Sequence, residues 1–266
     1  MSRKRPTVAD IRAMKGKYQF TMIRVETLEE LEAAEKAGVD MVSVPPEMMV
    51  LPHFREVAPS LFAVPGVNFF EVGTADDFVR WAFALYKASA DAVYCSASVA
   101  TVKRLADEAI PVIGHVGLIP SRATWTGGFK AVGKSAESAL KIFDAVKVYE
   151  AAGAFGAEIE VVPAEVAAAI SERTSLFMVS MGAGTGCDCQ YLFGDDLLGQ
   201  NRGHVPRHAK AYRNFAAELD RLQRERIAAF SEFAADVRSG IYPEQRHVVG
   251  IEAGELRRFF DGLPVS

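Results

Sequence analysis

Residues 156–170 read GAEIEVVPAEVAAAI, an apolar run that stops at Glu160 and is followed by a helical segment after Pro163. A short apolar run that leads into an amphipathic segment is typical of a buried parallel strand and its crossover helix. Residues 111–134, PVIGHVGLIPSRATWTGGFKAVGK, and residues 177–190, FMVSMGAGTGCDCQ, also place an apolar run before a glycine-containing loop. The three stretches predict parallel strands that end in polar residues and glycine loops.

The same alternation of short apolar runs and helical-period segments extends through most of the chain. It predicts an α/β protein with a TIM (β/α)8 barrel, a fold that takes about 250 residues. We expect N-caps at Thr74 and Ser135 and a first helical position at Pro163. The predicted strands are 19–24, 41–44, 61–65, 92–95, 112–115, 157–160, 176–180 and 191–195, and the predicted crossover helices are 27–37, 75–88, 98–109, 136–152 and 163–171.

Length and hydrophobic content favour one domain. A chain of 266 residues that is 50% hydrophobic can bury one barrel core. We therefore expect residues 1–266 to form a single (β/α)8-barrel domain, with residues from about 209 to 266 as a helical C-terminal extension. An apolar stripe in this extension either covers the barrel or contacts another subunit. The stripe consists of Phe215, Leu219, Leu222, Ile227, Phe230, Phe233 and Val237.

Charge and composition limit the partners. The net charge of -4 provides no basic surface, so we expect neither nucleic acid nor a membrane as a partner. No segment has the roughly 18 apolar residues of a membrane span, and we expect a cytoplasmic protein with a small ligand. Cys95, Cys187 and Cys189 are too few for a disulfide framework. Cys187 and Cys189 are expected to be free thiols rather than zinc ligands with His208.

Side chains at the carboxyl ends of barrel strands face the active site. Glu160 ends an apolar run, and a buried carboxylate must be paired, solvated or protonated because an isolated buried charge costs several kcal/mol. Glu160 is therefore either a general acid or base, or one partner of a salt bridge. His115 either binds a substrate carboxylate or oxyanion, or caps its strand. Tyr94 is either an acid or a packing residue.

The motifs GHVGLIP (residues 114–120), GAEIEVVP (residues 156–163) and MGAGTG (residues 181–186), in this order and spacing, resemble ketopantoate hydroxymethyltransferase. That family consists of TIM-barrel enzymes of the phosphoenolpyruvate mutase and isocitrate lyase superfamily. The resemblance implies that Glu160 handles the proton on a carbon of a 2-oxo acid and that His115 orients the substrate. It also implies methylenetetrahydrofolate as a one-carbon donor and a homo-oligomer, since the family forms rings of subunits.

The sequence departs from the family at the expected Mg²⁺ site. Family members hold Mg²⁺ through two aspartates and a glutamate at the ends of early strands, beside a lysine. Here the aspartate positions fall on Pro46 and Gly66, and the lysine and glutamate positions fall on Tyr94 and Ser96. Because Mg²⁺ needs oxygen ligands such as carboxylates, we expect the family's metal site to be lost.

Two consequences follow from the loss of these ligands. Glu47 and Glu71 are close in sequence to the changed positions and are candidates to rebuild a different metal site. Without a metal, enolisation of a 2-oxo acid needs another group to stabilise the enolate, such as the Tyr94 hydroxyl, His115 or backbone amides.

Together these features predict an enzyme that makes or breaks a carbon–carbon bond next to the carbonyl of a small 2-oxo acid. The alternatives are a metal-independent aldolase or lyase with another substrate, and a non-catalytic metabolite-binding paralogue. Gly182 and Gly184 either cradle a phosphate or permit close packing. The predicted catalytic residues are Glu160, His115 and Tyr94, and the predicted substrate-binding residues are Glu47, Asn68, Ser96, Lys130, Gly182 and Gly184.

Overall fold

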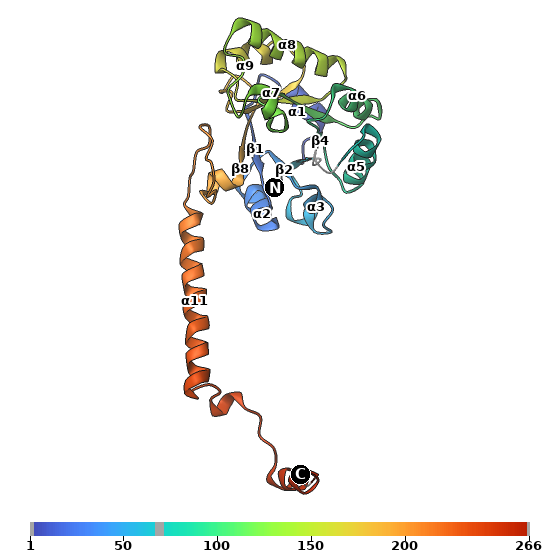
Figure 1. Cartoon of the computed structure of the whole chain (residues 1–266). Helices are drawn as coiled ribbons and strands as arrows, with labels where there is room; N and C mark the ends of the chain where they lie inside the picture. Colours follow the sequence, from blue (N-terminus) through green and yellow to red (C-terminus); the bar gives the residue numbers. More distant parts are fainter. Residues whose placement is uncertain (1–2, 67–71, 265–266) are drawn as a thin grey trace. The chain divides into compact units, whose positions relative to one another are not determined.

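The computed structural model describes residues 3–66 and 72–264, and Figure 1 shows the course of the chain. The chain divides into two compact units, Met1–Arg213 and Asn214–Ser266, which are described separately. The first unit contains the whole predicted barrel, and the second contains most of the predicted helical extension.

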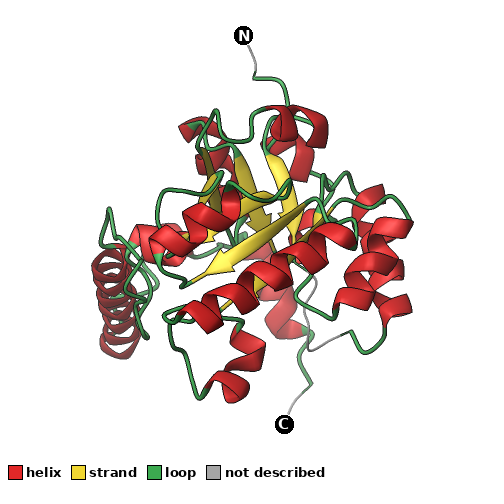
Figure 2. Ribbon diagram, turned by 90° about the horizontal axis from the view of Figure 1, so that it is seen from above, coloured by secondary structure: helices red, strands yellow, loops and turns green. Residues whose placement is uncertain are grey.

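Eight parallel strands form the barrel of the first unit. Neighbouring strands pair in the order β3-β2-β1-β8-β7-β6-β5-β4, and a bridge between Gly66 and Tyr94 joins the two end strands. Figure 2 shows the strands enclosed by helices. This arrangement confirms the predicted TIM-barrel fold. The strands are β1 (Phe20–Arg24), β2 (Met41–Val44), β3 (Phe62–Pro65), β4 (Val93–Tyr94), β5 (Val112–Gly117), β6 (Gly156–Glu160), β7 (Phe177–Met181) and β8 (Cys189–Phe193).

The five predicted crossover helices are confirmed as α2, α5, α6, α8 and α9. Thr74 and Ser135 cap two of them as predicted, each accepting a hydrogen bond from the backbone of the first turn. Pro163 is the N-cap of its helix rather than the first helical residue. The helices of this unit are α1 (Val8–Ala13), α2 (Leu28–Ala37), α3 (Pro46–Met49), α4 (Phe54–Val57), α5 (Ala75–Lys87), α6 (Val99–Asp107), α7 (Ala123–Thr126), α8 (Ala136–Ala151), α9 (Ala164–Ser171) and α10 (Gly194–Leu198).

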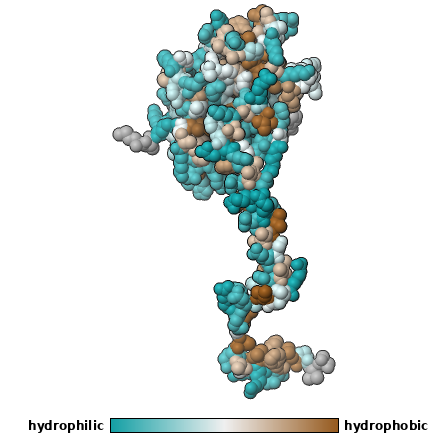
Figure 3. Space-filling view, turned by 90° about the vertical axis from the view of Figure 1, so that its left-hand side faces the viewer, coloured by the Kyte–Doolittle hydropathy of each residue, from teal (hydrophilic) through white to brown (hydrophobic). Residues whose placement is uncertain are grey.

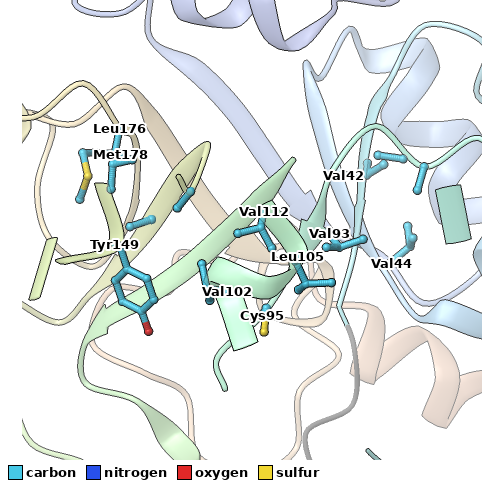
Figure 4. Packing of buried hydrophobic residues seen from close by; sticks show 14 of the residues in the cluster. Val42, Val44, Val93, Cys95, Val102, Leu105, Val112, Tyr149, Leu176 and Met178 are labelled. Atoms are coloured by element: carbon cyan, nitrogen blue, oxygen red, sulfur yellow. The ribbon is translucent and has the colours of Figure 1, made fainter. Parts of the chain in front are cut away.

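Strand alternation divides the core into an inner and an outer cluster. In β2, Met41 belongs to the inner cluster, whereas Val42 and Val44 belong to the outer one, between sheet and helices. Figure 4 shows part of the outer cluster. The rings of Phe155 and Phe177 stack in the inner cluster with their centroids 5.7 Å apart. The barrel interior is therefore a packed core, and ligands have room only beyond it.

Several predicted boundaries differ from the structure, and β5 extends to Gly117, two residues beyond its predicted end. The eighth strand is shifted by two residues, because Gly194 and Asp195 belong to the short helix α10 and not to a strand. The helix after the barrel starts at Phe215 and not at residue 209, because the Asn214 side chain accepts a hydrogen bond from Ala217 N and thereby fixes the helix start.

The second unit consists of α11 (Phe215–Ser239), a short 3-10 helix (Gln245–His247) and α12 (Ala253–Asp261). None of the described residues of α11 is buried, and its predicted apolar stripe is exposed on this unit. Figure 3 shows apolar residues at the surface of this unit. No described helix is both long and apolar enough to cross a membrane.

Candidate active site

A cavity of about 450 Å³ opens at the carboxyl ends of the strands, beyond the packed interior. Its wall combines apolar side chains with charged and polar ones, as is usual for a small-molecule site. The polar and charged residues that line it are Arg24, Glu26, Ser43, Glu47, Tyr94, Ser96, His115, Ser121, Glu158, Glu160 and Tyr191.

A buried polar cluster forms one wall of this cavity. His115 on β5 is 2% exposed, and its Nε2 atom lies 3.2 Å from Glu160 Oε2. Its Nδ1 atom shares a hydrogen bond with the Tyr94 hydroxyl. Among the described residues, Nε2 has no hydrogen-bond partner, so its contact with Glu160 is electrostatic. The cluster thus connects all three predicted catalytic residues.

Glu158 completes the cluster. It is directly opposite His115 in the β5–β6 register, and one ligand atom from each of His115, Glu158 and Glu160 lies within 4.8 Å of the others. Ile159, between the two glutamates, belongs to the outer hydrophobic cluster. Alternation along β6 therefore turns both carboxylates toward the cavity.

A glycine permits the close approach of the two strands at Glu160. Gly117 has a φ of 89°, and a Cβ atom there would lie 2.4 Å from the Glu160 carbonyl oxygen. Any side chain would push the end of β5 away from β6. Gly117, the second glycine of the GHVGLIP motif, thus allows His115 and Glu160 to lie on the same wall of the cavity.

Burial sets the charge of the cluster. Burial raises the pKa of Glu158 to about 7, with Glu160 adding to the shift and His115 opposing it. Burial alone lowers the pKa of His115, but the charges of Glu158 and Glu160 outweigh this effect and raise it. Burial also raises the pKa of Tyr94 well above its usual value. Near neutral pH, Tyr94 is therefore a neutral hydroxyl, and a proton is available on His115 or Glu158.

The residues that line the cavity determine which metal ions it could hold. The cavity wall at the ends of β2 and β3 carries Pro45, Pro46 and Gly66, which offer no carboxylate oxygen. Glu47 lines the cavity but is exposed. The His115–Glu158–Glu160 cluster could hold a cation, but its imidazole is a poor ligand for Mg²⁺. The described residues therefore do not fit Mg²⁺ at the positions that the family uses.

The structure brings five of the predicted site residues to the cavity, which are Glu160, His115, Tyr94, Glu47 and Ser96. Lys130, Gly182 and Gly184 are not among the described residues that line it. A Cβ atom on Gly182 would lie 2.7 Å from the His208 ring, and one on Gly184 would lie 2.5 Å from Ala164 Cβ. Close packing therefore accounts for both glycines. Asn68 and Glu71 lie outside the described residues.

Glu158 and Arg24 line the cavity but were not predicted as site residues. The spacing of Glu158 and Glu160 was the available signal, because residues two apart on a strand share a face. Arg24 ends β1 at the same edge of the barrel as the other strand ends.

Fold and site define a TIM-barrel enzyme with a buried histidine–carboxylate cluster at the active-site end. Residues 47–245 match the sequence profile of the family described as ketopantoate hydroxymethyltransferase. The chain belongs to this family, and the predicted resemblance is confirmed.

Curated relatives extend over nearly the whole chain. The chain is 31% identical to 3-methyl-2-oxobutanoate hydroxymethyltransferase of Nitratidesulfovibrio vulgaris, over 97% of this chain and 89% of the relative. The corresponding Thermus thermophilus enzyme is 33% identical, over 91% of this chain and 99% of the relative.

Solved structures support the fold alone. 2,3-Dimethylmalate lyase, a member of the PEP mutase/isocitrate lyase superfamily, aligns with a TM-score of 0.52 at 12% identity, over 97% of this chain and all of that chain. 3-Dehydroquinate dehydratase from Geobacillus kaustophilus also aligns with a TM-score of 0.52 at 12% identity, over 78% of this chain and 92% of that chain.

The raised pKa of Glu158 makes the free energy of unfolding of the protein depend on pH. Its folded pKa of about 7 exceeds the ordinary value of 4.5, so the protonated group contributes stability below pH 4.5 that is lost as the pH rises through 7. Glu158→Gln should therefore gain stability relative to the wild type between pH 5 and pH 8, by up to about 3 kcal/mol. Urea unfolding at both pH values, with a chelator present, measures this change.

Glu165→Gln is the matched control, because Glu165 is an exposed residue on α9. Its stability difference from the wild type should be the same at pH 5 and pH 8. A pH-independent difference for Glu158→Gln as well would show that Glu158 is ionised throughout this range.

Proposed function

We propose that this protein makes or breaks a carbon–carbon bond next to the carbonyl of a small 2-oxo acid. The specific reaction that we propose is hydroxymethyl transfer to 3-methyl-2-oxobutanoate, because the names of the relatives state this activity. The observation that carries the proposal is the buried contact of His115 with both Glu160 and Tyr94 at the cavity.

Glu160 acts as the general base in this proposal. Its carboxylate faces the cavity, and the residue is 8% exposed. Few water molecules can therefore compete with the substrate for contact with the carboxylate. It removes a proton from the substrate carbon next to the carbonyl, and the electron pair moves onto the carbonyl oxygen. The resulting enolate carbon then forms a bond with the carbon of a C=O or C=N group, whose π bond breaks and whose oxygen or nitrogen takes up the electron pair and a proton. In the reverse direction the bond breaks, and Glu160 returns the proton to the carbon.

Tyr94 and His115 stabilise the enolate oxygen. The neutral Tyr94 hydroxyl can donate a hydrogen bond to it, and a protonated His115 places a positive charge beside it. Both groups are held in place by their mutual hydrogen bond before the substrate arrives. In the hydroxymethyltransferase form, methylenetetrahydrofolate would supply the methylene carbon and water the hydroxyl group, and tetrahydrofolate would be released. Glu47 and Ser96 are proposed to contact the substrate from the cavity wall.

The proposed reaction does not use Mg²⁺, because the residues at the family's metal positions, Pro46 and Gly66, have no carboxylate. This favours the metal-independent form of the reaction, in which an aldolase or lyase substrate is the alternative to ketopantoate chemistry. The non-catalytic alternative is less favoured, because a purely structural barrel has no need for two carboxylates and a histidine buried together at the cavity.

Glu160→Gln should abolish proton transfer while retaining binding. The amide has nearly the same shape but cannot accept the substrate proton, so exchange at C3 of 3-methyl-2-oxobutanoate in deuterated water should fall by at least about 100-fold. Proton NMR follows the exchange, and isothermal titration follows the affinity. Glu165→Gln, on the exposed face of α9, should exchange at the wild-type rate.

Exchange by Glu160→Gln within threefold of the wild type would remove Glu160 as the base. Absence of exchange in the wild type, for every 2-oxo acid tried, would instead favour the non-catalytic alternative.

We also propose that the protein is a cytoplasmic homo-oligomer. The exposed apolar side chains of α11 support this, because a continuous apolar stripe is usually covered by protein. Phe230 and Phe233 on this helix are 73% and 55% exposed.

Light scattering should give a mass that is a multiple of the 28.9 kDa chain. Phe230→Glu should lower that mass, because it places a charge on the apolar stripe, whereas Arg224→Glu, on the opposite face of the same helix, should not. A monomeric wild type would contradict the proposal.

A further inference from the structure

We propose that Arg24 and the open side of Gly66 form a subsite for the carboxylate of an anionic substrate. This inference rests on the proposed function, because it assigns the substrate's charged group a place in the same cavity. It concerns binding alone and involves no covalent step.

The charge distribution of the cavity points to Arg24. Among the described residues that line the cavity, Arg24 is the only lysine or arginine, whereas four glutamates line it. An anion therefore meets repulsion from most of the charged wall. Arg24, at the end of β1, is therefore the permanent cation of this described lining, although Glu26 partly compensates its charge through an ion pair.

The guanidinium group is oriented by two contacts. Nε donates to Glu26 Oε1 at 2.6 Å, and Nη1 donates to Ser43 Oγ at 3.3 Å. Nη2 donates no hydrogen bond to any described residue, and the Arg24 side chain is 20% exposed. A carboxylate can bind an arginine through two parallel hydrogen bonds. The edge formed by Nη1 and Nη2 therefore has donor capacity for such a group.

Gly66 leaves space beside this edge. A Cβ atom on Gly66 would lie 3.8 Å from Arg24 Nη1 and 3.7 Å from Tyr94 Cδ1. The open side of Gly66 is thus flanked by the guanidinium group and by the Tyr94 ring. Both distances are ordinary contacts and the Gly66 φ is not positive, so neither backbone strain nor packing against the described residues requires a glycine here.

The subsite also orients a 2-oxo acid. Its carboxylate beside Arg24 and Gly66 directs the neighbouring carbonyl toward Tyr94, whose hydroxyl contacts His115. In the order of the strands around the barrel, β1 lies opposite β5. The anionic end of the substrate is therefore kept away from Glu158 and Glu160, and its reacting carbon is directed toward them.

Isothermal titration of the full chain tests the subsite, with 3-methyl-2-oxobutanoate, pyruvate and oxalate as probes. Arg24→Gln should raise the dissociation constant at least 30-fold, and Arg24→Lys should raise it less, because the charge remains but the paired donors are lost. Gly66→Ala should raise it at least tenfold while the Tm stays within 2 °C of the wild type. Arg80→Gln, on the exposed face of α5, should bind all probes as the wild type does.

The methyl ester of 3-methyl-2-oxobutanoate separates charge recognition from damage to the site, since its affinity should be the same for Arg24→Gln and the wild type. Acid binding by Arg24→Gln or Gly66→Ala within threefold of the wild type would overturn the subsite and leave the proposed function standing. Loss of binding in these variants, together with absence of proton exchange by the wild type for every 2-oxo acid that it binds, would retain the subsite and overturn the proposed function. Failure of the wild type to bind any of the three probes would overturn both.

Discussion

The burial of two carboxylates and an imidazole on a pair of adjacent strands is the constraint on which the site depends. Isolated buried charges cost several kcal/mol each, so Glu158, His115 and Glu160 are tolerable only as a group that shares charge and protons. The Tyr94 hydroxyl on β4 holds the imidazole from its other side. Gly117 makes the arrangement possible, because only a residue without a side chain lets β5 approach Glu160 so closely.

The fold was predictable because each strand and helix carries its own local signal. Apolar runs such as residues 177–181 and caps such as Ser135 need no knowledge of distant residues. Glu160 and His115 were predictable as polar residues at strand ends. The two-residue spacing of Glu158 and Glu160 indicates a shared face of the strand, but the burial of Glu158 depends on its pairing with β5, which the sequence does not show. The role of Gly182 and Gly184 could not be decided from the sequence, because close packing and phosphate binding leave the same sequence pattern.

In the proposed account, the chain keeps the fold of its family but compensates the charge of the substrate in a different way. The chain belongs to the ketopantoate hydroxymethyltransferase family, yet the strand ends carry Gly66 and two prolines where a divalent cation would need carboxylates. The proposed account gives the tasks of a cation to protein groups. Arg24 attracts the substrate anion, while Tyr94 and His115 stabilise the enolate. Such a change keeps the fold and the base while altering how charge is compensated.

Proton exchange at C3 of 3-methyl-2-oxobutanoate, measured by NMR on metal-stripped protein with EDTA and then with excess Mg²⁺, tests the central claim most directly. The account predicts exchange catalysed by Glu160 at the same rate in both conditions. Exchange that is absent in EDTA and restored by Mg²⁺ would contradict it, because a cation would then be doing what is assigned here to Arg24, Tyr94 and His115.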